Sequence, residues 1–171
     1  MLTLSLKKRL LGAYNLEKRA PIQWGITHER NAKDDYCKEG SATVLPTGMY
    51  KKNNIHQSGI LGASPDGLVQ GVYSGPVHLQ QNGQQLLSLD ITDIKCPFSA
   101  TDMTVAETCC SNKDFFLEPP SHEGLMLKET HDYRNQIQGQ LYLTGTNCCD
   151  LIVWTPKDMQ IIRIVKYDSY S

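Results

Sequence analysis

Residues 86–97 read LLSLDITDIKCP, an apolar run that partly alternates with polar residues. This pattern predicts a buried β-strand, and Pro97 predicts its end because proline has no N–H for a sheet ladder. Successive side chains of a strand point to opposite faces of the sheet. Asp93 and Lys95 are therefore expected to lie on one face, close to the end of the strand.

An aspartate in a turn precedes this strand. Residues 60–69 read ILGASPDGLV, so two apolar stretches flank the turn signal Ser-Pro-Asp-Gly. We expect a β-hairpin with Asp66 at its bend. Two carboxylates and one ammonium at adjacent strand ends suit phosphate chemistry, because carboxylates bind Mg²⁺ or Mn²⁺ and a lysine orients water or offsets charge. The same short pattern also describes a simple surface ion pair between Asp93 and Lys95.

The rest of the chain predicts a mixed architecture of helices and strands. Helices are expected at 25–37 and 131–144, the second ended by Gly145. Strongly β-type runs occupy 149–154 and 159–165. Weaker patterns predict a helix at 2–20, a loop or short strand at 40–58, an extended loop at 71–85, a short helix within 98–124 and a brief strand at 125–127. This order predicts an α/β or α+β sandwich with a mixed sheet, in a single domain over residues 1–171.

Composition limits the class of protein. The chain has 171 residues, 40% of them apolar, and a formal net charge of -1, which fits one globular domain. This charge neither supports nor excludes a nucleic-acid partner, because a basic groove can lie beside an acidic metal site. No apolar run approaches the roughly 20 residues of a membrane span, and residues 1–9 lack the order of a secretion signal. We therefore expect an intracellular protein of the nucleus or cytoplasm, without a membrane partner.

The six cysteines are expected to be reduced, mostly buried thiols. Four of them form the adjacent pairs Cys109-Cys110 and Cys148-Cys149, and adjacent cysteines can bridge each other only with strain. They also lack the C-x2-C spacing of zinc sites. Reduced thiols agree with an intracellular protein.

Separated blocks of the sequence resemble one nuclease family. GASPDGL at 62–68, followed by DIKCP at 93–97, resembles the YqaJ-type viral recombinases, relatives of lambda exonuclease in the PD-(D/E)XK nuclease superfamily. Further resemblances are to its glutamate-bearing helix at 25–32, its tyrosine- and glutamine-bearing helix at 131–141 and a following strand at 149–156. The resemblance covers most of residues 25–165. It implies a restriction-endonuclease-like α/β core, in which α-helices flank a central mixed β-sheet.

The resemblance also implies a role for each residue of the site. Asp66, Asp93 and the main-chain carbonyl of Ile94 would bind catalytic Mg²⁺, for which Mn²⁺ can substitute. Lys95 would position or activate the attacking water. Glu29 would project toward the metal, although its helical spacing alone favours an exposed carboxylate. The helix at 131–144 would supply the remaining residues. Gln136 would hold the nucleophile, the metal or a nearby phosphate, and Tyr133 and Arg134 would contact DNA. Gln138 and Gln140 would serve packing or the helix surface.

The chain departs from the family pattern in three ways. Aspartate stands at position 93, where the family usually has glutamate. A long polar insertion separates Asp66 from Asp93. Family members often carry more N-terminal sequence, so we expect a shortened member or a fragment.

Three functions are compatible with these features. The first is a Mg²⁺-dependent 5′-to-3′ exonuclease that acts on double-stranded DNA in viral or mobile-element recombination. For this function, the resemblance is compatible with a single-strand annealing protein as partner and with a homo-oligomer. The second is an endonuclease or repair nuclease on the same fold. The third is a catalytically silent DNA-binding or interaction module. The short N-terminus and Asp93 motivate this hypothesis, whereas the intact set of Asp66, Asp93, Lys95 and Gln136 argues against it.

Overall fold

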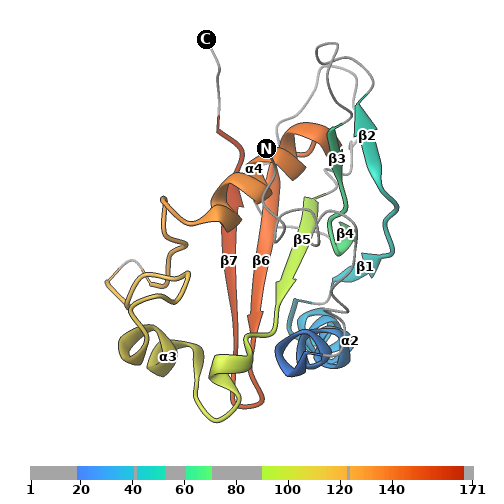
Figure 1. Cartoon of the computed structure of the whole chain (residues 1–171). Coiled ribbons are helices and arrows are strands. Elements are labelled where there is room, and N and C mark those ends of the chain that lie inside the picture. Colours follow the sequence, from blue (N-terminus) through green and yellow to red (C-terminus); the bar gives the residue numbers. More distant parts are fainter. Residues whose placement is uncertain (1–18, 41, 53–60, 71–89, 123, 168–171) are drawn as a thin grey trace, which may run out of the picture.

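A five-stranded mixed sheet lies at the centre of the structure, in the strand order β1-β4-β5-β6-β7. The strands are β1 (Thr43–Leu45), β4 (Gly67–Gln70), β5 (Asp90–Lys95), β6 (Cys148–Trp154) and β7 (Met159–Val165). Strands β5 and β6 run parallel and the other neighbours antiparallel (Figure 1). The computed structural model describes residues 19–40, 42–52, 61–70, 90–122 and 124–167. The loop predicted at 71–85 and nearly all of the helix predicted at 2–20 lie outside these ranges.

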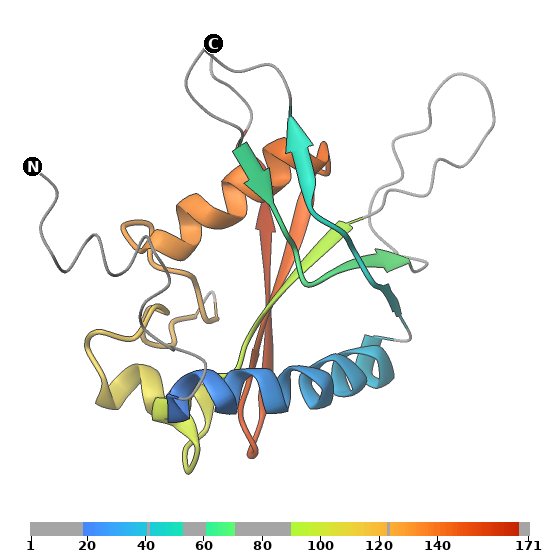
Figure 2. The ribbon, with the colours of Figure 1, turned by 45° about the vertical axis from the view of Figure 1, so that its right-hand side comes forward.

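Two long helices, α2 (Ala20–Gly40) and α4 (Asp132–Thr144), pack on opposite faces of this sheet. Figure 2 shows the strands running between them. The alternation of β5 explains the two cores, because Ile91 packs with α4 residues while Ile94 packs with α2 residues. Strand β6 lies between β5 and β7 and is buried along almost its whole length, which agrees with its nearly continuous apolar sequence.

Helix α4 has a clear signal at each end. The Nδ1 atom of His131 accepts a hydrogen bond from the Tyr133 N–H at 3.2 Å, which satisfies one of the free donors of the first turn. Gly145 ends the helix with a φ of 75°, a left-handed conformation that glycine adopts without steric cost. The helix predicted at 131–144 is therefore confirmed, and the one predicted at 25–37 lies within the longer α2.

The hairpin predicted at 60–69 is wrong. Strand β3 (Leu61–Ala63) pairs with β2 (Tyr50–Lys52) in a separate sheet, whereas β4 pairs with β1 and β5. The physical reason is long-range pairing, since the Asp66 N–H donates to the Thr92 carbonyl at 2.9 Å and starts the β4–β5 ladder. Asp66 therefore lies where the chain passes from one sheet to the other, and not at the bend of a hairpin.

The segment after β5 forms a short 3-10 helix, η2 (Phe98–Ala100), and a helix, α3 (Val105–Ser111), as predicted in outline. The strand predicted at 125–127 is wrong, because Leu127 makes only an isolated bridge with Leu117. Pro119 and Pro120 follow on the partner side and have no N–H with which to extend a ladder.

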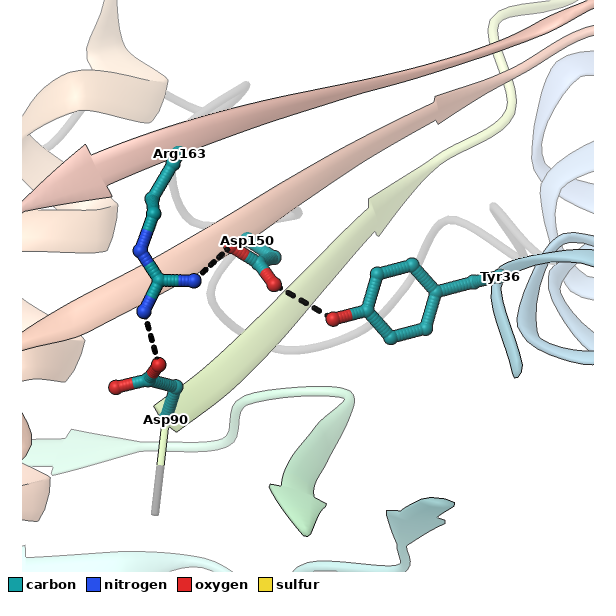
Figure 3. Close-up of polar contacts among 4 residues, drawn as sticks. All are labelled: Tyr36, Asp90, Asp150 and Arg163. Atoms are coloured by element: carbon teal, nitrogen blue, oxygen red, sulfur yellow. Dashed lines mark hydrogen bonds and ion pairs between the residues drawn. The ribbon is translucent and has the colours of Figure 1, made fainter. Parts of the chain in front are cut away.

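A buried polar network ties α2 to the sheet (Figure 3). The Tyr36 hydroxyl donates to Asp150 Oδ2 at 2.6 Å. Arg163 Nη1 lies 3.2 Å from Asp150 Oδ1, and its Nη2 pairs with Asp90. These contacts join α2 to β5, β6 and β7, so they set the position of the helix on the face where Glu29 also lies.

All six cysteines are free thiols, as predicted, but only Cys109 and Cys149 are buried. Burial raises the pKa of Cys96 to about 12 and that of Cys109 to about 11, so both are protonated at neutral pH. Within the described residues, no helix has the length and apolar character to cross a membrane.

Candidate active site

Asp93 and Lys95 lie on one face at the end of β5, as the strand alternation predicted. The Lys95 ammonium is 2.7 Å from Asp93 Oδ2, and the side chain of Asp93 is only 1% exposed. Lys95 Nζ also lies 4.6 Å from the centre of the Tyr133 ring, which comes from α4. Although burial opposes the charged form, Asp93 holds the pKa of Lys95 above its usual value. Lys95 is therefore an ammonium at neutral pH.

Asp66, the residue just before β4, reaches the same end of β5. Its Oδ2 accepts a hydrogen bond from the Ile94 N–H at 2.7 Å, which fixes the carboxylate against the strand. Burial raises the pKa of Asp66 to about 6, and the charges of Asp93 and Glu29 add to this rise. The carboxylates of Asp66, just before β4, and of Asp93, in β5, are therefore close enough to repel each other.

Helix α2 brings Glu29 and Lys33 to this group. Lys33 Nζ lies 4.0 Å from Glu29 Oε1 and donates to the Asp66 carbonyl at 3.1 Å. The side chain of Glu29 is 45% exposed. The sequence allowed either an exposed carboxylate or one directed at the site, and each description holds in part. Glu29 is partly solvated, and its charge still raises the pKa of Asp66.

The predicted residues of α4 divide into two groups. Tyr133 lies at the site, beside Lys95. Arg134 instead donates to the Tyr167 hydroxyl at 2.6 Å and pairs with Glu129. Gln136 is exposed, and within the described part of the chain no hydrogen bond joins it to the carboxylates or to Lys95. Its roles toward nucleophile, metal or phosphate stay a prediction.

The sequence interpretation missed two residues of the site, Lys33 on α2 and Gln140 on α4. Gln140 was expected to serve packing or the helix surface, yet it is 4% exposed and its Nε2 donates to Asp93 Oδ1 at 3.3 Å. The available signal was its position on α4. Gln140 follows the buried Ile137 by three residues and precedes Leu141, so it is a polar residue on an apolar helix face.

The donors of this site fit a magnesium ion better than a zinc ion. In the described ranges, no three His, Cys, Asp or Glu side chains are arranged to hold a metal. Mg²⁺, however, is commonly bound by one or two carboxylates together with water and substrate phosphate. Asp93 Oδ2 lies 2.7 Å from the Lys95 ammonium, and because a carboxylate has about four acceptor positions, it can bind a cation beside the lysine. A divalent cation would also offset the repulsion that raises the pKa of Asp66.

Comparison with known proteins supports this description of the fold. The profile of the YqaJ-like viral recombinase domain matches residues 2–147. The structure of an alkaline exonuclease from Laribacter hongkongensis, LHK-Exo, is similar at 24% sequence identity and a TM-score of 0.57, and that of its complex with dAMP at 24% and 0.58. Each comparison covers 94% of this chain and 65% of the other, so this chain spans less than two thirds of that protein. A search of curated proteins gives no match. The predicted α/β fold, with helices flanking a central mixed sheet, is confirmed.

Proposed function

Because the chain belongs to the YqaJ-like viral recombinase domain family, we propose that it is a Mg²⁺-dependent deoxyribonuclease that hydrolyses phosphodiester bonds. One observation carries the proposal. Two carboxylates and an ammonium meet at the end of β5, with Asp66 bonded to the Ile94 N–H and Lys95 paired with Asp93. These groups provide metal ligands and a positive charge next to each other, a combination that suits metal-dependent cleavage of a phosphodiester.

Each residue has a role that follows from its environment. Asp66 and Asp93, with the Ile94 carbonyl, would hold Mg²⁺ or Mn²⁺. Bound there, the ion would polarise a phosphate oxygen and lower the pKa of a water molecule. Lys95 is an ammonium and cannot accept a proton, so it orients the attacking water or offsets the charge that develops on the phosphate. Burial beside Tyr133 limits the side-chain freedom of Lys95 and keeps it directed at the site.

Helices α2 and α4 complete the proposed site. Glu29 adds negative charge beside Asp66 and binds the metal directly or through water. Gln136 lies one turn before Gln140 on α4 and is exposed, so a nucleophile or phosphate can approach it. Tyr133 and Arg134 are the proposed DNA contacts. Arg134 would keep its bond to Tyr167 while it meets a phosphate, because guanidinium has five N–H donors.

The mode of attack is the finer part of the proposal. The similar solved structures are those of an alkaline exonuclease, one of them in complex with dAMP. We extend this activity to the present chain as a 5′-to-3′ exonuclease on double-stranded DNA in viral or mobile-element recombination. A single-strand annealing protein as partner and a homo-oligomer as assembly belong to the same proposal, as does one nuclease domain over the whole chain.

The test uses the full chain with Mg²⁺ or Mn²⁺ on linear and circular duplex DNA. Release of nucleotides from linear DNA alone supports the exonuclease, and cleavage of circular DNA indicates an endonuclease instead. Lys95→Ala should lower the rate by about 10²–10³-fold or more without loss of folding. Lys38→Ala is the matched control, because that side chain is 77% exposed on α2. A folded wild type that neither cleaves DNA nor binds Mn²⁺ would be a silent module.

A further inference from the structure

A glutamine side chain is buried beside the proposed metal ligands, on a helix face that is otherwise apolar. Gln140 is 4% exposed and follows Ile137 and precedes Leu141, which are both fully buried. A buried amide costs free energy unless it is hydrogen-bonded. An aliphatic residue would fill this position without that cost, so the amide needs an explanation beyond packing.

The amide is only half satisfied. Its Nε2 donates to Asp93 Oδ1 at 3.3 Å, whereas its Oε1 is buried without a hydrogen-bond partner among the described residues. A side chain chosen for stability alone would satisfy both ends or neither. The burial of the Gln140 amide therefore carries a cost in free energy. The hydrogen bond that its side chain makes among the described residues is to Asp93.

The contact restrains the Asp93 carboxylate in a way that Lys95 alone cannot. Gln140 approaches Oδ1 from α4, and Lys95 approaches Oδ2 from the strand itself. With a donor group at each oxygen, the carboxylate cannot turn about its Cβ–Cγ bond without losing one of them. Lysine is a long flexible side chain, whereas Gln140 projects from the buried face of a packed helix. A carboxylate has about four acceptor positions, so both contacts leave room for a cation.

We propose that Gln140 is a positioning residue that holds the Asp93 carboxylate in the orientation in which it binds the metal ion. This inference rests on the proposed function of the site. It differs from a structural role in one measurable way. Removal of the amide should weaken metal binding at only a modest cost in stability, because Asp93 Oδ1 loses a buried donor while the unpartnered Oε1 of Gln140 disappears as well.

The test is a calorimetric titration of Mn²⁺ into the metal-free full chain, for the wild type and for Gln140→Met. Methionine is unbranched and similar in volume, so it should fill the space without strain. We expect the dissociation constant for Mn²⁺ to rise about 10–100-fold, as is typical when a partner of a metal ligand is removed. Cleavage by the variant should recover toward the wild-type rate at high Mn²⁺, because the catalytic groups remain.

Gln138→Met is the matched control, with the same substitution on the same helix. The Gln138 side chain is hydrogen-bonded to the Val165 carbonyl and to the Tyr167 N–H, away from Asp93. The Gln138→Met variant should therefore bind Mn²⁺ with the same affinity as the wild type. Equal affinities for the wild type and Gln140→Met would overturn this inference and leave the proposed function intact. A large loss of melting temperature in Gln140→Met would also overturn it, in favour of a structural role. A wild type that binds no Mn²⁺ and cleaves no DNA would overturn both.

Discussion

Replacing Asp66 by asparagine should stabilise the metal-free protein at neutral and higher pH and should also remove its nuclease activity. Burial raises the pKa of Asp66 from 3.8 to about 6, and Asp93 and Glu29 add to that rise. Asparagine keeps an oxygen that can accept the Ile94 N–H, but it carries no charge. The variant therefore removes the repulsion and retains the hydrogen bond that fixes this side chain.

The sign and size of the effect follow from proton linkage. The pKa of Asp66 is higher in the folded than in the unfolded chain, so the folded state binds the proton more tightly. The protonated Asp66 side chain therefore stabilises the folded state below about pH 3.8, and this contribution is lost as the pH rises to about 6 and above. A rise from 3.8 to about 6 corresponds to ~3 kcal/mol, and solvent screening at this partly exposed residue reduces it to about 2 kcal/mol. In a domain of this size, that is about 4–8 °C in melting temperature.

The assay is thermal unfolding of both proteins in a chelator, at about pH 4 and about pH 8, on either side of the titration. Groups that titrate in both proteins cancel in the comparison. We expect Asp66→Asn to melt higher than the wild type at the higher pH, with a smaller difference at the lower pH. The control Asp34→Asn, which removes an exposed carboxylate from helix α2, should show no such trend. An equal difference at both pH values, or a lower melting temperature for Asp66→Asn at about pH 8, would refute the reasoning.

Three further predictions concern the fold and the substrate. Gly67→Ala should lower both melting temperature and cleavage, because its Cβ would lie 2.2 Å from Val44 Cγ1. By contrast, Gly139→Ala, which meets open space on α4, should stabilise by about 0.5–1 kcal/mol in urea unfolding; equal stabilities of the two variants would contradict this account. Tyr36→Phe should lower the free energy of unfolding by about 1.5–3 kcal/mol in urea, since Asp150 loses a buried donor, and no measurable change would contradict the role given to the network. Cleavage should fall at least about tenfold between roughly 50 and 200 mM salt, because DNA phosphate contacts release counterions, and a flat profile would argue against DNA as substrate.

The elements with local signals were predicted well. Helix α4 follows its periodic pattern and ends at Gly145, and strands β6 and β7 follow their apolar runs. The common face of Asp93 and Lys95 was also predictable, because strand alternation is a property of neighbouring residues. These features depend on a few consecutive side chains and on backbone geometry, which the sequence contains directly.

The features that depend on distant partners were not predictable in the same way. The turn signal at Asp66 indicated a hairpin, but β3 and β4 pair with different strands. Which strand a segment joins depends on the whole set of available edges and on burial, and a local turn signal does not contain that information. Gln140 was overlooked for a related reason, since a helical pattern identifies a buried face but not the group that lies opposite it.

The sequence by itself determined the chemical groups of the site, which are two aspartates, a lysine and the strand that presents two of them together. Only the tertiary structure decided that Asp66 bonds to the Ile94 N–H, that α2 brings Lys33 to the Asp66 carbonyl, and that Gln140 contacts Asp93. The physical reason is the range of each interaction. Side-chain direction along a strand repeats every two residues, whereas these three bonds join positions 28 to 47 residues apart and form only when both faces of the sheet are packed.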